Sequence, residues 1–506
     1  LDEDEDQMNI GFFGGKNNHD WGDYDNDGDL DLISSGITLP DFAPNLKIFK
    51  NTNGILNIDN SQSELIQQSQ SAVIWLNINN DNYLDLISMP YLYINDGTGI
   101  MNLSNNTIIN NNVSSTGLHA LAAGDFNSDG FDDLAISYSD LENSQMYTDI
   151  YINDTTEQFK LHQQLQGTSY AGLDWGDYDN DGDLDLISSG FTNSVINDFN
   201  VTEYLEPITT VYLQNSEGNF IIDTTLYMLD SVGHSSTQWG DYDNDGDLDL
   251  LMSGFNADQE PISKVFDNLE GINNANKAPN SPYSPNVSEI NDNRVTLSWS
   301  SPSDPTNNLG GSTSETALQY RLQVGSEDVD NDHSIISGNY GVGRIGVTSL
   351  TNKKLYNIPE GNYKWRVRAM DHGFSLSDWS RWDYFYVDIT APKVDSIRAN
   401  YVANNQIILV IEFKEDFNLD LNVDPKVQVT HPDNIAHSGE DTLSVEKQSY
   451  NGDEWTGILV LPDDYAGQAI QVHVSGAQDE RGNVLSHTSI FKTPETVISQ
   501  YGGTSI

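Results

Sequence analysis

The stretch WGDYDNDGDLDL runs from Trp21 to Leu32, returns letter for letter from Trp175 to Leu186, and returns again from Trp239 to Leu250. Within each copy the acidic residues stand at alternate positions, so a loop that curls around a centre directs them inward together. Calcium takes about six to eight oxygen ligands from carboxylates and backbone carbonyls, and a glycine at the sixth position of a loop allows the sharp turn that closes it. The repeated stretch therefore predicts a series of calcium-binding loops.

Four loops carry a full set of predicted ligands, with side chains at the first, third, fifth and ninth positions and a backbone carbonyl at the seventh. The sets are Asp23, Asp25, Asp27, Asp29 and Asp31; Asp125, Asn127, Asp129, Phe131 and Asp133; Asp177, Asp179, Asp181, Asp183 and Asp185; and Asp241, Asp243, Asp245, Asp247 and Asp249. A fifth copy has lost its glycine and two carboxylates, so we expect weak calcium binding or none there. Its residues are Asn77, Asn79, Asp81, Asn82 and Asp85.

The residues that follow each loop distinguish it from the EF-hand, the main competing calcium loop. An EF-hand needs a bidentate glutamate at position twelve and a helix on either side. Position twelve is Ser34, Ser188 or Met252 in the three identical copies, and a short apolar run such as LDLISSG follows the loop, which is typical of a strand. The loop is therefore predicted to join two strands. A solvated acidic turn is the other reading, and the recurrence of the loop argues against it.

The first ligand positions are 23, 77, 125, 177 and 241, so the repeat is 48 to 64 residues long. This is the length of one four-stranded propeller blade, and such blades must stack around an axis to bury their faces. We expect an all-β fold with a β-propeller of four-stranded blades, five of them visible. The fifth repeat lacks a clear fourth strand, which an N-terminal segment such as Gln7–Phe13 can supply. Further blades outside this sequence are the alternative.

These repeats resemble the FG-GAP or VCBS repeats of integrin-like propellers over about residues 1–275, with aspartates at fixed spacing followed by LDL and a small residue. The resemblance implies that calcium is held in the hairpin loop of each blade, chiefly for structure. Seven blades are usual in this family, so five visible repeats are a departure and the blade number stays open. Trp21, Trp75, Trp175 and Trp239 recur two residues before a first ligand. We expect these side chains to pack between blades rather than to stack on sugars.

Two further domains are predicted after the propeller of residues 1–275. A proline-rich linker leads into strand-like segments such as YKWRVRAMD, and residues 276–388 resemble a fibronectin type III sandwich. After a Thr-Ala-Pro hinge, residues 389–496 resemble a bacterial immunoglobulin-like sandwich. Residues 497–506 are expected to be a tail or a linker to a further part.

The composition of the chain limits the kinds of partner that it is expected to bind. The chain has 77 acidic and 22 basic residues, no cysteine and a net charge of −55. The first arginine is Arg294, so the repeats lack the basic surface that phosphate contacts need, and nucleic acid binding is excluded. No apolar run reaches the roughly 18 residues of a membrane span. We expect an extracellular protein, secreted or attached to a cell surface.

No catalytic motif stands out, and we expect a protein that is not an enzyme. The favoured hypothesis is a calcium-binding adhesion or structural surface protein, in which the propeller presents a binding face to a protein or glycan at a cell surface or matrix and the sandwiches act as spacers. Self-assembly is a further mode of association open to it. The alternative is an extracellular carbohydrate-active enzyme, a polysaccharide lyase or hydrolase, or its glycan-binding module. The scarcity of basic residues among the repeats counts against a lyase, which must neutralise a uronate.

Overall fold

The structure is a computed structural model in which every regular element of the described residues is a strand. No helix in this part of the chain is long and apolar enough to cross a membrane. Two compact units divide the chain, the first made of residues 1–288, 296–356 and 363–385 and the second of residues 289–295, 357–362 and 386–506. The described residues are 18–38, 43–52, 55–67, 72–108, 118–140, 145–192, 194–196, 202–204, 206–226, 229–268, 275–291, 294–308, 310–327, 347–348, 350–402, 406–415, 418–430, 443–462, 470–485 and 489–492.

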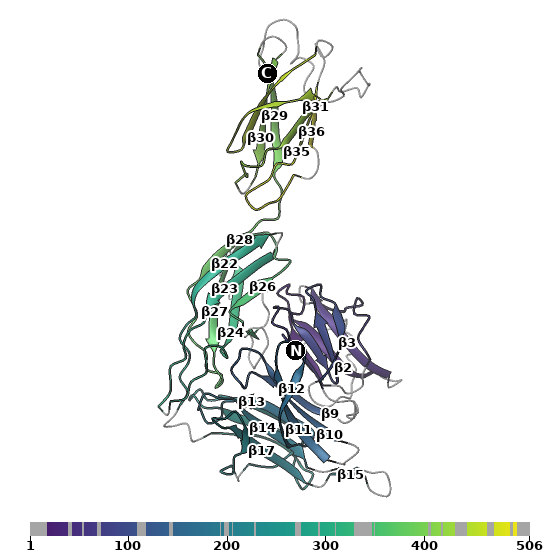
Figure 1. Cartoon of the computed structure of the whole chain (residues 1–506), viewed down its shortest axis with the longest axis vertical. Coiled ribbons are helices and arrows are strands. Elements are labelled where there is room, and N and C mark those ends of the chain that lie inside the picture. Colours follow the sequence, from purple (N-terminus) through teal and green to yellow (C-terminus); the bar gives the residue numbers. More distant parts are fainter. Residues whose placement is uncertain are drawn as a thin grey trace. The chain divides into compact units, whose positions relative to one another are not determined.

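Five antiparallel sheets in the first unit correspond to the five sequence repeats, and Figure 1 draws them in purple to teal. Each sheet is a meander in which strands follow one another in chain order. Their strands are β1 (His19–Gly22), β2 (Asp31–Thr38), β3 (Ala43–Thr52) and β4 (Ile55–Ile58); β5 (Val73–Leu76), β6 (Asp85–Ser88), β7 (Tyr91–Asn95) and β8 (Met101–Thr107); β9 (Leu118–Gly124), β10 (Asp133–Asp140), β11 (Gln145–Asn153) and β12 (Phe159–Gln166); β13 (Ser169–Gly176), β14 (Asp185–Phe191), β17 (Pro207–Gln214) and β18 (Phe220–Ile222); and β19 (Gly233–Gly240), β20 (Asp249–Phe255) and β21 (Pro261–Phe266). A small ribbon of β15 (Ser194–Ile196) and β16 (Thr202–Tyr204) extends from the fourth sheet's connection.

The acidic loop occupies the same place in every sheet. The residue before the first ligand position pairs with the ninth-position aspartate across the first two strands, as Gly176 does with Asp185. The equivalent pairs are Gly22 with Asp31, Leu76 with Asp85, Gly124 with Asp133 and Gly240 with Asp249. Each loop is thus the hairpin connection between two strands, as predicted, and no EF-hand helix flanks it in the described residues.

The first strands of the five sheets lie in a series, with β1, β5, β9, β13 and β19 each in contact with the next. Residues from all five of these strands line one cavity of about 980 Å³. In a propeller, the blades surround a central channel, so a cavity shared by the first strands is consistent with that architecture. The described residues show this all-β array but not a closed ring, and Gln7–Phe13 lies outside them.

Tryptophan side chains join successive sheets. Trp75, Trp175 and Trp239 are buried, and each stacks on the second-position aromatic ring of the preceding acidic loop. The pairs are Trp75 with Tyr24 at 5.6 Å between ring centroids, Trp175 with Phe126 at 6.0 Å, and Trp239 with Tyr178 at 5.3 Å. These three residues therefore pack between successive sheets, which is the part of the predicted packing between blades that the structure confirms. Trp21, in the first sheet, is 37% exposed.

The later strands form four small antiparallel sheets. The first two contain β22 (Tyr283–Asn291), β23 (Arg294–Ser300) and β26 (Asn352–Leu355), and β25 (Val347–Thr348), β24 (Gln319–Ser326), β27 (Gly361–Met370) and β28 (Asp383–Val387). The other two contain β29 (Lys393–Tyr401), β30 (Gln406–Lys414), β34 (Glu454–Val460) and β33 (Glu446–Asn451), and β32 (Leu443–Ser444), β31 (Lys426–Thr430), β35 (Gln471–Ser475) and β36 (Ser489–Lys492).

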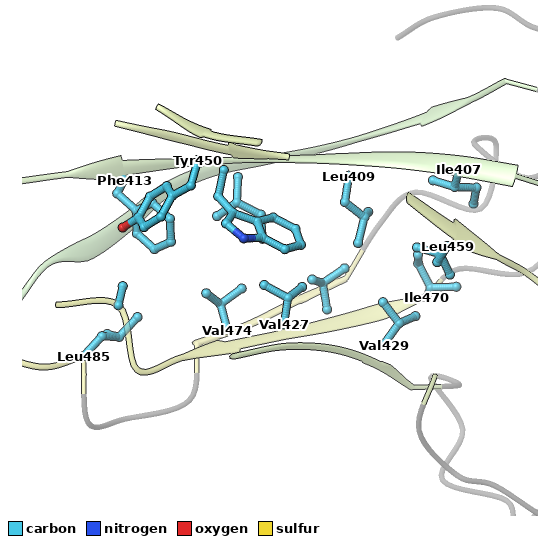
Figure 2. Close-up of a cluster of buried hydrophobic side chains, with 14 of the residues drawn as sticks. Ile407, Leu409, Phe413, Val427, Val429, Tyr450, Leu459, Ile470, Val474 and Leu485 are labelled. Carbon is cyan, nitrogen blue, oxygen red and sulfur yellow. The ribbon is translucent and has the colours of Figure 1, made fainter. Parts of the chain in front are cut away.

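The last two sheets pack face to face as a sandwich. Alternate residues of β30 are buried, which is the period-two pattern of a strand with one face against a core. Figure 2 shows Phe413 and Tyr450 of one sheet pointing toward Val474 and Leu485 on the other side of the core. The apolar side chains of the strands therefore form a core of their own in the second unit.

Candidate metal centre

The fourth acidic loop illustrates how the chain wraps around its carboxylates. Asp177 accepts hydrogen bonds from the backbone N–H groups of Asp181 and Gly182, both at 2.9 Å. Asp179 accepts a second contact from the Asp181 N–H at 3.2 Å, and Asp181 in turn accepts from the Asp183 N–H at 3.0 Å. Each side chain thus turns back on the loop's own backbone, as aspartate does in Asx turns. Side chains at alternate positions are held toward one interior.

Three loops bring carboxylate oxygens within 4.8 Å of one another. The groups are Asp23, Asp25 and Asp27 in the first loop, Asp177, Asp179 and Asp185 in the fourth, and Asp241, Asp243 and Asp249 in the fifth. The predicted ligands Asp31, Asp181 and Asp245 belong to the same loops but fall outside these groups. The third loop, where Asn127 replaces an aspartate, is not among the described carboxylate groups that meet this distance.

The backbone of each loop takes the turn that the sequence predicted. The sixth-position glycine has a positive φ in all four full loops, for example +101° at Gly182. The fourth position is also left-handed, with φ of 58° at Asn180 and 60° at Ser128. Asparagine tolerates this region better than most residues, which explains the recurrent Asn in the motif. No role of this position was predicted from the sequence.

The ninth-position aspartate has a structural role beside any metal. In the fourth loop, Asp185 accepts the Tyr178 N–H at 3.1 Å through one oxygen and the Gln214 N–H at 2.9 Å through the other. It therefore ties the start of its loop to the end of the third strand. In the other sheets, the equivalent aspartate accepts the backbone N–H of an asparagine at the same place, at 2.8 to 2.9 Å. The acceptor and donor pairs are Asp31 and Asn51, Asp85 and Asn95, Asp133 and Asn153, and Asp249 and Asn268.

Burial and mutual repulsion disfavour the charged form of these carboxylates when no cation is present. Burial, then the neighbouring aspartates, raises the pKa of Asp177 and Asp185 well above the usual range. Burial raises the pKa of Asp179 and of Asp27 to about 6. A divalent cation among the oxygens supplies the opposite charge and removes the repulsion.

The first loop differs from the others because two lysines reach it. Lys50 forms an ion pair with Asp25, and its Nζ lies 3.8 Å from Asp27. The Nζ of Lys353 lies 3.5 Å from Asp23, which is almost fully buried. The cluster thus attracts cationic groups, and a calcium ion there has to compete with them.

The donor set fits calcium. Every carboxylate in the three groups is an oxygen donor, and the sites contain no thiolate or imidazole ligand. Hard oxygen donors in a flexible loop suit calcium, whereas nitrogen and sulfur donors suit zinc and copper. Asp29, Asp183, Asp247 and Phe131 occupy the seventh position, where the N–H donates to the fifth-position carboxylate. Their predicted carbonyl ligation stays a prediction.

The ends of the acidic loops contact later segments of the first compact unit. The loop carbonyls accept hydrogen bonds from residues between 276 and 372. The contacts are Tyr356 N–H to Asn26 at 2.7 Å, the Thr316 hydroxyl to Ser128 at 2.7 Å, His372 Nδ1 to Gly182 at 3.0 Å, and Asn276 N–H to Gly246 at 2.7 Å. The loops therefore act as contact surfaces as well as candidate metal sites.

Comparisons with known proteins bear on one of these loops directly. Residues 118–143 match the FG-GAP repeat. They comprise β9, the third acidic loop and β10 with the residues that follow it. No curated protein matches the sequence. Among solved structures, a two-domain fibronectin type III segment from chicken tenascin is similar, with 14% identity, a TM-score of 0.18, and coverage of 42% of this chain and 99% of that one. A TM-score this low carries no argument about arrangement.

Sequence reasoning missed the amide side chains that link neighbouring sheets. Near the end of the third strand in the second, fourth and fifth sheets, an Asn or Gln donates to the loop of the preceding sheet. The bonds are Asn95 to the Tyr24 carbonyl at 2.7 Å, Gln214 to Phe126 at 3.0 Å, and Asn268 to Tyr178 at 3.1 Å. The signal was present, because an Asn or Gln recurs there in FKN, YIN, YLQ and FDN.

Proposed function

We propose that this chain is an extracellular calcium-binding adhesion or structural surface protein. In this proposal the acidic loops hold calcium and stiffen a propeller, the irregular loops between strands present a binding face to a protein or glycan, and the sandwiches act as spacers. The family match at residues 118–143 and the array of five repeated sheets support the scaffold.

A comparison between two loops carries the calcium assignment. In the second loop, Asn77 and Asn79 both accept the Asp81 N–H at 3.2 Å. In the fourth loop, Asp177 and Asp179 accept the equivalent N–H at 2.9 and 3.2 Å. Asparagine therefore makes the same turn without charge. The aspartates add electrostatic repulsion that the turn does not require. A bound cation would offset this repulsion.

Counting bound calcium tests the metal assignment. The full chain is exchanged into calcium buffer and its ions are counted by native mass spectrometry. We expect Asp179→Ala and Asp243→Ala each to remove one ion, because each deletes one of three converging carboxylates. Asp258→Ala, at an exposed turn outside the loops, is the matched control. Unchanged counts in both loop variants would refute the calcium assignment.

A binding screen tests the proposed adhesion. The protein is applied to glycan and matrix-protein arrays with calcium and with EGTA, and the same glycans are assayed for cleavage. Calcium-dependent binding without turnover is the expected result. Release of products from a uronate polysaccharide or a glycosaminoglycan would instead show a carbohydrate-active enzyme and would overturn the proposal.

A further inference from the structure

A fourth group of carboxylates lies in the second compact unit, away from the repeated loops. Oxygens of Asp388, Glu415 and Asp479 lie within 4.8 Å of one another. Asp388 directly follows β28, Glu415 directly follows β30, and Asp479 lies in the turn after β35. Asp388 and Asp479 are 4% and 1% exposed. Three separate segments thus bring acidic side chains to one buried place.

One oxygen of this group lacks the partner that burial requires. Asp388 Oδ1 accepts the Thr390 N–H at 3.1 Å, but its Oδ2 is buried and has no hydrogen-bond partner. Asp479, by contrast, accepts from the N–H groups of Arg481 and Asn483 and from the Asn483 side chain, at 2.8 to 2.9 Å. Buried polar atoms are nearly always paired, so an orphaned carboxylate oxygen beside two other carboxylates calls for a ligand.

The charges around the group are mostly of one sign. Glu360 adds a further carboxylate, whose oxygen accepts from the Thr390 hydroxyl. Arg481 is the opposing cation whose field reaches Asp388. Burial first, then the repulsion of Asp479 and Glu360, raises the pKa of Asp388 despite the Thr390 hydrogen bond and Arg481. Of the charged groups that act on Asp388 among the described residues, Asp479 and Glu360 are acidic and Arg481 is basic. A divalent cation would therefore offset negative charge at this place.

We infer that Asp388, Glu415 and Asp479 bind a divalent cation, and that the ion is calcium. All three are hard oxygen donors, and calcium accepts irregular sets of carboxylates completed by carbonyls and water, whereas magnesium demands near-octahedral geometry. The ion ties the connection between β28 and β29 to the end of β30 and to the turn after β35. This reinforces the hydrogen bond that the Asn483 side chain already donates to the Asp388 carbonyl at 3.0 Å.

Ion counting on the full chain tests this site separately from the repeated loops. The wild type, Asp388→Asn and Glu415→Gln are exchanged into calcium buffer and compared by native mass spectrometry. Both variants are expected to hold one calcium ion fewer than the wild type. Glu446→Gln, an exposed acid of the same sandwich, is the matched control and is expected to keep the full count.

Thermal unfolding shows whether a variant has kept its fold. Calcium should raise the melting temperature of the second unit in the wild type and not in Asp388→Asn, while in EGTA the variant should melt no lower than the wild type because it has lost a repulsive charge. Equal ion counts in the wild type and both variants, a loss in Glu446→Gln, or occupancy by magnesium but not calcium would overturn the inference. Asp179→Ala and Asp243→Ala report on the propeller loops alone, so either proposal can fail without the other.

Discussion

The tryptophan that lies two residues before the first ligand position should stabilise the fold only in those repeats where it packs against the preceding sheet. Trp175 is 3% exposed, stacks on Phe126 and lies 5.4 Å from Phe220 between ring centroids. Its indole lies over Gly124, where an added Cβ would come within 3.0 Å of the ring. Trp21 occupies the same position in the first repeat but is 37% exposed.

The expected loss of stability on replacement by alanine differs between Trp175 and Trp21. Replacing a buried tryptophan by alanine costs about 3 to 5 kcal/mol, because it removes apolar contacts and leaves a cavity. Replacing a partly exposed side chain outside a core by alanine costs about 1 kcal/mol or less. We therefore expect Trp175→Ala to lower the free energy of unfolding by at least about 2 kcal/mol more than Trp21→Ala does.

Urea unfolding followed by far-ultraviolet circular dichroism measures this difference without relying on tryptophan fluorescence. The glycines that receive the indoles give an independent check. An added Cβ at Gly176 would lie 2.9 Å from the Trp239 ring, whereas one at Gly240 has nothing within 4 Å. Gly176→Ala should therefore destabilise and Gly240→Ala should not. If Trp21→Ala costs as much stability as Trp175→Ala, and Gly240→Ala as much as Gly176→Ala, then the surfaces at Trp21 and Gly240 are covered in solution and the reasoning is wrong.

Three further predictions concern a loop contact, calcium and pH. Gly182→Ala should cost more than Gly218→Ala in urea unfolding, because both have positive φ but only at Gly182 does an added Cβ meet backbone, that of Ser312 at 2.3 Å. In calcium at about a hundred times its Kd, one site contributes about 2.7 kcal/mol, so Asp179→Ala should lose about that much stability in calcium and little in EGTA. Burial raises the pKa of Asp371 to about 8. The folded state therefore binds this proton more tightly than the unfolded state, and stability falls as pH rises from about 4 to 8, by at most about 1.4 kcal/mol per pH unit. Asp371→Asn should reduce this dependence of stability on pH. An unchanged dependence would show that Asp371 is not its source.

The sequence predicted the repeated loops well because their geometry is local. Alternating aspartates, a left-handed glycine and a following strand all lie within about a dozen residues, and such short-range patterns determine the turn directly. The structure accordingly places Asp177, Asp179 and Asp185 together on the hairpin that the pattern predicted. The predicted ligand Asp181 turns instead to the Asp183 N–H in this structure.

Features that depend on pairing between distant segments were not predictable in the same way. Asp388, Glu415 and Asp479 are separated by dozens of residues, and each is an ordinary acidic residue beside a strand end. Their oxygens come together only in the folded chain, because the three residues follow strands of three different sheets. A closed ring would be a feature of the same kind, since it would depend on which surface meets Trp21 and Tyr242 rather than on any motif.

The second loop shows that the hairpin and the proposed metal site depend on different residues. Asp85 is fully buried and accepts the Ile78 and Asn95 N–H groups at 2.9 and 2.8 Å. Its equivalents in the first, fourth and fifth sheets accept the corresponding pair of N–H groups. Asn82, with φ of 72°, takes the left-handed turn in place of glycine. The hairpin therefore survives when carboxylates are lost from the first and third positions. Because the ninth-position aspartate accepts an N–H near the end of the third strand in all five sheets, its presence says little about calcium. In the proposed calcium assignment, the loss of both carboxylates at the first and third positions is what separates the second loop from the loops that are proposed to bind an ion.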